Sequence, residues 1–252
     1  TGGETMSIAI RIARAFTGKD KILFCGYHGW YDWYLSANLK SSKMLNQHLL
    51  KGLKPLGVPK GLRGTVIPFK FNSFEDLEKI VRKNSKNCAA IVLEPCRETL
   101  PSIEYLKELK KISIKSKCVL IFDEITSGFR VNTGGIHMKL GVHPDLAIFG
   151  KTIANGIPMG AIIGKKNIMQ YAEKTFLSSA FWTEKTGPAS AVEFIKKHKK
   201  LNLGNILNKK GEKIKDIWRR AARNADLDIE IKGISPLATF KLNTKTDWPT
   251  TI

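Results

Sequence analysis

Residues 118–151 read CVLIFDEITSGFRVNTGGIHMKLGVHPDLAIFGK and contain two short apolar runs, each followed by an ionisable side chain. The run CVLIF is followed by Asp123 and Glu124, and the run LAIFG is followed by Lys151. Runs that are apolar on both faces are typical of parallel strands covered by helices. Ligands gather at the carboxyl ends of such strands, so these polar residues are the first candidates for a functional site.

The rest of the chain alternates strand-like and helix-like segments. Strand-like runs cover residues 21–26, 88–95, 118–124, 146–150 and 161–164, and amphipathic segments with helical spacing cover residues 4–18, 74–83 and 102–116. Ser73 and Ser102 are predicted helix N-caps, and Gly18 a C-terminal stop. This order predicts a three-layer α/β fold in which a mostly parallel sheet lies between helices. Residues 30–59 lack a clear period, so we expect an irregular surface segment there.

The sequence changes in character after about residue 189. Lysine-rich helical stretches follow, and then two strand-like segments, IEIKGI and LATFKL. We therefore expect residues 1–190 to form a large domain and residues 191–252 to begin a smaller α+β domain. Because the chain starts at Thr1 without a methionine, we also expect it to be a piece of a longer protein.

The charge balance is unusual, with 42 Lys and Arg against 22 Asp and Glu, a formal charge of +20. Such a balance raises the prior for nucleic-acid binding, but the basic residues are scattered and form no known nucleic-acid motif. A lysine-rich, solvated surface is therefore favoured over a nucleic-acid partner. No apolar run approaches the roughly 18 residues of a membrane-spanning helix, so we expect no membrane partner. The four cysteines form no C-x-x-C pair, which favours buried, reduced thiols in a cytoplasmic protein.

Two glycine-containing or aromatic segments are candidate contacts for a ligand. Gly2 and Gly3 precede a helix, where free N–H groups favour an anion such as phosphate, although an ordinary N-terminal turn is the favoured interpretation of two glycines alone. Tyr27 follows a strand and offers a ring that stacks on a flat ligand, or one that packs on the core. His28 is solitary in the sequence, and no cluster with metal-ligand spacing predicts a metal site.

Asp123 and Lys151 are the residues with the strongest chemical implication. A carboxylate at the end of a buried strand needs a donor, which a protonated ring nitrogen, a helix N-terminus or a salt bridge can supply. A lysine at the mouth of a buried strand is a nucleophilic amine if desolvated, or an ordinary lysine if it reaches solvent.

Together these features have one economical explanation. A phosphate cradle, a stacking ring, a carboxylate and a lysine, in this order on a parallel sheet, are the parts needed to hold pyridoxal 5'-phosphate (PLP). The lysine would form the Schiff base, and the aspartate would keep the pyridine nitrogen protonated.

The sequence resembles the class III (subgroup II) PLP-dependent aminotransferases, including their glutamate-1-semialdehyde 2,1-aminomutase-like members. The resemblance lies in TGGETMSIAIRIARAFTGKDKI, CGYHGWYDW, IVLEP, LIFDEITSGFR, GVHPDLAIFGKTIANGIPMGAIIG and FWTEKTGPASA, which occur in the family's order. It implies the large domain of a fold type I PLP-dependent transferase, without the family's N-terminal segment and most of its C-terminal domain. It also implies a homodimer with a shared active site.

The resemblance also implies roles for particular residues. Lys151 would bind PLP and shuttle the substrate proton, and Asp123 would contact the pyridine nitrogen. Tyr27 and Ile125 would cover the two faces of the ring. The remaining implied contacts are Gly2 and Gly3 with the phosphate, Thr183 with the phosphate of the partner subunit, and Glu94 near the site.

Three positions depart from the family pattern. Gly3 stands where Ser or Thr is usual, so the backbone alone must serve the phosphate there. Thr99 replaces the acidic residue of ornithine- and GABA-type members, and Thr186-Gly187-Pro188 replaces Gly-Asn-Pro. Arg97 lies near the expected pocket and is either a contact for a substrate carboxylate or a surface arginine.

The sequence therefore predicts a PLP-dependent aminotransferase that acts on a small-molecule amino donor and acceptor. The alternative within the same chemistry is a glutamate-1-semialdehyde 2,1-aminomutase, in which the amino transfer is intramolecular. A basic nucleic-acid-binding module or a catalytically silent fragment is the alternative from another class.

Overall fold

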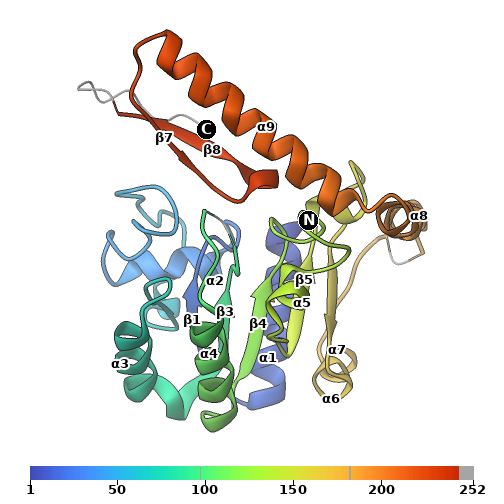
Figure 1. Cartoon of the computed structure of the whole chain (residues 1–252). Helices are drawn as coiled ribbons and strands as arrows, with labels where there is room; N and C mark the ends of the chain where they lie inside the picture. Colours follow the sequence, from blue (N-terminus) through green and yellow to red (C-terminus); the bar gives the residue numbers. More distant parts are fainter. Residues whose placement is uncertain (97, 182, 244–252) are drawn as a thin grey trace.

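A computed structural model of the chain describes residues 1–96, 98–181 and 183–243 (Figure 1). Its centre is a six-stranded sheet with the order β2-β1-β3-β4-β5-β6. The strands are β1 (Lys21–Cys25), β2 (Val66–Pro68), β3 (Cys88–Leu93), β4 (Val119–Asp123), β5 (Leu146–Phe149) and β6 (Ala161–Gly164). All neighbours pair in parallel except β5 and β6, which are antiparallel. The predicted mostly parallel sheet is confirmed.

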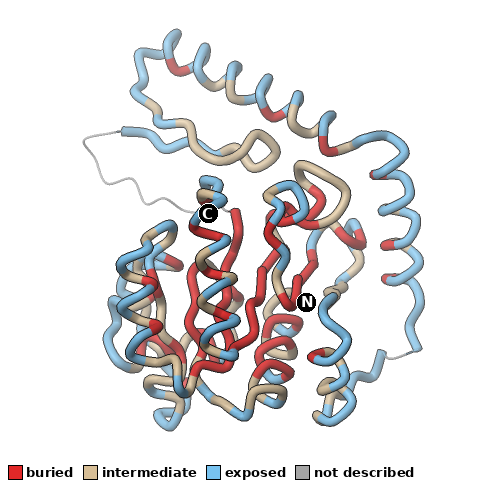
Figure 2. Tube along the Cα trace, turned by 60° about the horizontal axis from the view of Figure 1, so that its bottom comes forward, coloured by how far each residue is buried: buried red, intermediate tan, exposed pale blue. Residues whose placement is uncertain are grey.

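Helices cover both faces of this sheet, which confirms the three-layer α/β fold (Figure 1). One face carries α1 (Gly2–Thr17), α6 (Lys166–Met169) and α7 (Tyr171–Lys174), and the other carries α3 (Phe74–Asn84) and α4 (Ile103–Lys115). Successive strand residues serve opposite faces: Ile22 and Phe24 pack in the core beneath α1, whereas Leu23 and Cys25 pack in the core beneath α3 and α4. The four central strands β1, β3, β4 and β5 are therefore buried along nearly their whole length (Figure 2), whereas the edge strands β2 and β6 are more exposed.

The ends of the main helices follow the predicted caps. Ser73 Oγ accepts a hydrogen bond from Asp76 N at 3.4 Å, and Ser102 Oγ accepts one from Tyr105 N at 3.1 Å. Gly18 ends α1 in the left-handed region, with φ at 64°. Because each of these contacts joins residues within one helical turn, the helix boundaries could be predicted from the sequence.

The connections contain short elements that complete the fold. Residues 30–59 hold only α2 (Asp32–Leu35) and the 3₁₀ turn η1 (Ser36–Leu39), as expected for an irregular segment. The other short elements are η2 (Lys60–Leu62), η3 (Ser85–Asn87), α5 (Ile136–Leu140) and η4 (Lys151–Ile153).

The C-terminal elements are α8 (Thr186–Lys200), α9 (Leu203–Asn224), and the antiparallel hairpin of β7 (Ile229–Lys232) and β8 (Thr239–Leu242), which encloses η5 (Ser235–Leu237). A Cβ atom at Gly211 of α9 would lie 1.9 Å from the carbonyl oxygen of Ser235. Only glycine therefore permits this close approach of α9 to the hairpin. The division into domains at residues 190 and 191 stays a prediction.

All four cysteines are free and buried. Burial, assisted by the nearby Glu94 carboxylate, raises the pKa of the Cys25 and Cys96 thiols to about 12 each. In the described part of the chain, no helix combines the length and the apolar character needed to cross a membrane.

Asp145, just before β5, links three elements through one carboxylate. It accepts hydrogen bonds from Leu120 N at 2.9 Å, from Lys110 Nζ at 2.7 Å, and from Lys165 Nζ at 2.8 Å. Burial opposes ionisation of this carboxyl group, but the hydrogen bonds from the two lysines and from the Leu120 amide outweigh it, and the pKa of Asp145 lies below its ordinary value. The carboxylate therefore stabilises the junction of β4, β5 and α4.

We predict that Asp145→Ala lowers the free energy of unfolding by about 1–3 kcal/mol at neutral pH, because the buried Leu120 N–H loses its acceptor. A lowered pKa stabilises the fold above the ordinary aspartate value and loses that contribution as the pH falls through the folded-state value. Urea unfolding should therefore show the difference from wild type shrinking below about pH 4. Asp32→Ala, at an exposed aspartate, serves as the control, and an equal loss in both variants would contradict the prediction.

Candidate active site

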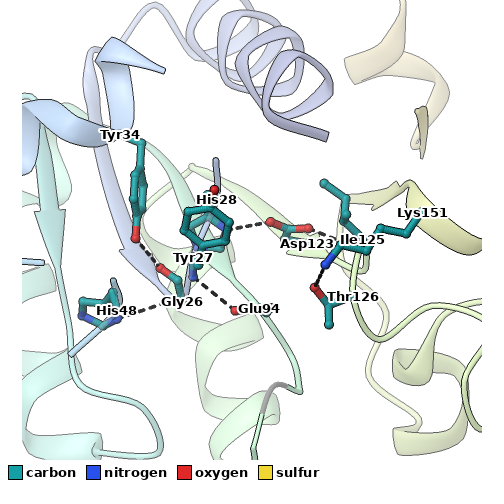
Figure 3. A network of polar contacts seen from close by, with 10 residues as sticks. All are labelled: Gly26, Tyr27, His28, Tyr34, His48, Glu94, Asp123, Ile125, Thr126 and Lys151. Atoms are coloured by element: carbon teal, nitrogen blue, oxygen red, sulfur yellow. Dashed lines mark hydrogen bonds and ion pairs between the residues drawn. The ribbon is translucent and has the colours of Figure 1, made fainter. Parts of the chain in front are cut away.

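The carboxyl ends of β1, β4 and β5 bring the predicted residues into one region (Figure 3). Tyr27 follows β1, Asp123 ends β4, and Lys151 follows β5. Ile125 lies between the last two in the close-up view, and its side chain is also the nearest neighbour of a Cβ atom built on Gly2, at 3.1 Å, or on Gly150, at 3.3 Å. The start of α1, the end of β4 and the end of β5 therefore converge on Ile125.

Asp123 is a buried carboxylate with two donors. Its Oδ2 lies 2.8 Å from His28 Nδ1, and its Oδ1 accepts a hydrogen bond from Ile125 N at 3.1 Å. Because a carboxylate oxygen only accepts, His28 Nδ1 carries the proton in this contact. A carboxylate has about four acceptor positions, so Asp123 retains capacity for a further donor.

His28 is the residue whose partner the sequence did not reveal. Its side chain is fully buried, and the rings of Phe24, Trp33 and Tyr34 lie around it, with centroids between 5.8 and 6.4 Å away. His28 Nε2 is a buried polar atom with no hydrogen-bond partner among the described residues. The only sequence clue was its place directly after Tyr27 at a strand end, where polar side chains of a parallel sheet meet.

Lys151 begins η4 in a strained backbone conformation. Its φ is 47°, in the left-handed region that costs an L-residue roughly 1–2 kcal/mol. The side chain is exposed, and Nζ donates a hydrogen bond to Thr126 Oγ1 at 2.9 Å. Thr126 was not among the predicted site residues, because its distance from Lys151 in the sequence hides the contact.

Glu124 anchors the turn that carries Ile125 and Thr126. Its fully buried carboxylate accepts hydrogen bonds from His137 N at 3.0 Å, from His137 Nδ1 at 2.9 Å, and from Ser127 Oγ. These three donors replace the water that a buried charge loses. The turn is therefore fixed from inside the protein, immediately after β4.

Gly2 and Gly3 start α1, where free backbone N–H groups favour an anion. A Cβ atom at Gly3 would lie 2.9 Å from the ring of Tyr31. This contact gives a physical reason for the departure from the family pattern, because the side chain of a serine or threonine would strike the ring.

Glu94 fixes the backbone at the end of β1. Its Oε2 accepts a hydrogen bond from Tyr27 N at 3.1 Å, and its side chain is buried. Gly26, with φ at 120°, allows this approach, since a Cβ atom there would lie 2.5 Å from Glu94 Cβ. Glu94 and Thr99 both line a cavity of about 220 Å³.

Two predicted residues are not joined to this cluster. Thr183 is exposed and precedes α8, whose N-terminus is capped by Glu184 through hydrogen bonds from Thr186 N at 2.7 Å and Gly187 N at 3.3 Å. A hydrogen bond from the Thr186 side chain, together with these backbone hydrogen bonds, lowers the pKa of Glu184. Arg97 lies outside the described residues.

The residues present fit PLP. The cluster combines an amine at Lys151, a buried carboxylate at Asp123 with a free acceptor position, and a glycine-rich helix start that meets the same isoleucine. This donor set suits a small aromatic ring that carries an aldehyde, a ring nitrogen and a phosphate. Among the described residues, no group of three or more His, Cys, Asp or Glu side chains is placed to hold a metal ion.

The sequence pattern of the class-III aminotransferases matches residues 1–246. The chain belongs to the class-III aminotransferase family. It is 33% identical over 250 residues to the 3-aminobutyryl-CoA aminotransferase of Cloacimonas acidaminovorans (strain Evry). This match covers 96% of this chain and 56% of that relative. It is 37% identical over 177 residues to the glutamate-1-semialdehyde 2,1-aminomutase of Ignicoccus hospitalis, covering 68% of this chain and 41% of the relative.

The fold is also that of solved transaminase structures. A structure described as a transaminase with PLP bound superposes with a TM-score of 0.81 at 25% identity, covering 96% of this chain and 57% of that one. The chain thus spans about half the length of the relatives it matches. The similarity confirms the predicted fold and family.

We predict that His28→Leu lowers the free energy of unfolding by about 3–5 kcal/mol, because it leaves the buried Asp123 Oδ2 without its donor. The double variant His28→Leu with Asp123→Leu removes both polar partners and should cost less than the sum of the two single variants. Urea unfolding of the four proteins measures this coupling. Strictly additive losses would show that the two side chains do not act as a pair.

Proposed function

We propose that this chain is the PLP-binding part of an aminotransferase, with Lys151 as the residue that binds the cofactor covalently. The observation that carries the proposal is the position of Lys151 and Asp123 at the carboxyl ends of adjacent strands, on either side of Ile125 (Figure 3). Membership of the class-III aminotransferase family supports the same chemistry. When bound, PLP supplies an aldehyde for an amine and a ring that accepts an electron pair.

The chain's own residues would perform distinct tasks around this cofactor. The Asp123 carboxylate, oriented by His28, would accept the hydrogen bond of a protonated ring nitrogen and hold that proton. The Tyr27 ring and the Ile125 side chain would cover the two ring faces. The backbone N–H groups at Gly2 and Gly3 would bind the phosphate.

Lys151 has a second task after it gives up the covalent bond. Its amine would take the proton from the substrate carbon and return it at the neighbouring position, which requires the amine to stay close to the ring. Small-molecule amino donors and acceptors are the expected substrates. Arg97 and Glu94 are the proposed contacts for them near the site.

The second candidate is a glutamate-1-semialdehyde 2,1-aminomutase. It is favoured by the 37% and 38% identity to aminomutases of Ignicoccus hospitalis and Archaeoglobus fulgidus, which exceeds the 33% to the aminotransferase. That higher identity covers 68% of the chain, whereas the aminotransferase match covers 96%. Feeding the protein glutamate 1-semialdehyde without an amino donor separates the two: formation of 5-aminolevulinate identifies the aminomutase.

The proposed functional unit is a homodimer in the cytoplasm. Large apolar side chains are exposed on the segment before α8, with Phe176 at 85% and Phe181 at 76%, and such surfaces often mark contacts between subunits. Thr183 lies in the same segment, where it would reach the phosphate held by the partner subunit. Four free, buried cysteines support a reducing compartment.

We predict that borohydride treatment with PLP modifies Lys151 and that Lys151→Ala abolishes this modification, because the Lys151 amine follows β5 at the strand end where Ile125 and Asp123 lie. Peptide mass spectrometry locates the modified residue. Lys139→Ala, which removes an exposed lysine elsewhere, is the control, and PLP should modify its Lys151 as it does in the wild-type protein. Persistent cofactor trapping at another lysine of the Lys151→Ala variant would refute the assignment.

We predict that Lys151→Ala and Thr183→Ala, each inactive as a pure protein, recover part of the activity when unfolded and refolded together. A mixed dimer then contains one site with both residues intact, which is the consequence of a site shared between subunits. Light scattering reports the oligomeric state of each preparation. No recovery in a sample that contains mixed dimers would exclude the proposed role of Thr183.

A further inference from the structure

Lys151 contacts Thr126, a residue that has no part in the proposed function. Nζ donates to Thr126 Oγ1 at 2.9 Å, although the lysine side chain is exposed and its four-carbon stem is flexible (Figure 3). An exposed amine normally samples many positions in solvent. The left-handed backbone of Lys151, with φ at 47°, starts the side chain from a fixed and unusual direction.

Thr126, which contacts this amine, lies in a turn that several hydrogen bonds hold in place. Its carbonyl oxygen accepts a hydrogen bond from Arg130 Nε at 3.1 Å, and Gly128 N closes the turn on Glu124 O at 2.7 Å. Glu124 itself is held by three buried donors. The backbone from which the Thr126 hydroxyl projects is therefore held by hydrogen bonds to the buried turn after β4.

We propose that Thr126 is a positioning residue for the Lys151 amine, and this inference rests on the proposed function. A neutral amine has two N–H groups and one lone pair. When one N–H donates to Thr126 Oγ1, the lone pair points away from the hydroxyl and remains free to react. The hydroxyl thus holds the nucleophile near Ile125 and Asp123 before the cofactor bond exists.

The reaction that benefits is the attachment of an aldehyde to Lys151. The nitrogen lone pair forms a bond to the aldehyde carbon, and the aldehyde oxygen leaves as water with both amine protons, so atoms and charge balance. Holding the amine in the productive orientation reduces the entropy lost on reaching the transition state. The hydroxyl itself is not consumed.

The test measures the first-order rate of PLP attachment at saturating PLP in Thr126→Val, which keeps the shape of threonine but lacks the hydroxyl. Thr126→Ser keeps the hydroxyl and is the matched control. The rate is followed across pH by absorbance, and the product is located on Lys151 by mass spectrometry after borohydride trapping. Binding of inorganic phosphate and thermal unfolding report on the rest of the site and on the fold.

We expect Thr126→Val to lower the high-pH plateau of the rate about two- to tenfold, the range of one lost hydrogen bond. The serine variant should stay near wild type, and phosphate affinity should be unchanged in both variants. At the plateau the amine is neutral, so a slower rate there reports orientation rather than protonation. If Thr126→Val unfolds at a lower temperature, Thr126→Ala replaces it, because alanine adds no branched side chain to the turn.

A wild-type plateau in the variant without the hydroxyl would overturn the inference, and so would a shifted pH midpoint with an unchanged plateau. An equal slowing in the serine variant would also overturn it, because the hydroxyl would then not be the cause. Failure of the proposed function has a different outcome: wild type itself would then show no attachment at Lys151.

Discussion

The parallel pairing of β4 with β5 is the constraint on which the site depends. In its register Asp123 lies opposite Ile148, so the chain needs only Phe149 and Gly150 before it presents Lys151 at the same edge. Side chains alternate between the faces of a sheet, so a slip by one residue would turn Asp123 toward the opposite helix layer. The apolar residues of β4, which pack against α1 on one side and α3 and α4 on the other, make that slip unfavourable.

Buried carboxylates are a second structural feature at the carboxyl ends of these parallel strands. Glu94, Asp123 and Glu124 are all at least 95% buried, and each accepts hydrogen bonds from backbone N–H groups as well as any side-chain donors. Backbone donors cannot move independently of the sheet, so each charge fixes the loop that follows its strand. The negative groups thereby serve as structural links at the place where a reactive ring would have to be held without freedom to tilt.

The sequence was most informative where short-range chemistry decides the structure. Ser73, Ser102 and Gly18 act on residues within one helical turn, and the apolar runs identify the long parallel strands directly. β2 escaped prediction because three residues ending in Pro68 carry no periodicity. The antiparallel direction of β6 follows from the short connection through residues 150–160, which leaves no room for a crossover helix.

The candidate site was predictable as residue types but not as contacts. Asp123 and Lys151 were found because ionisable groups interrupt apolar runs. The contacts of His28 with Asp123 and of Thr126 with Lys151 were missed because they join positions that only the folded sheet brings together. The same limit applies to Glu124, whose donors come from Ser127 and from α5.

The ring of Tyr31 against Gly3 has an evolutionary consequence. Space for a hydroxyl-bearing residue at position 3 exists only if the aromatic side chain at position 31 becomes smaller or turns aside. The two positions are therefore expected to change together among descendants of this chain. A lineage that acquires serine at the helix start should show a compact residue in place of the tyrosine, and the order of the two replacements matters because the serine alone would contact the ring.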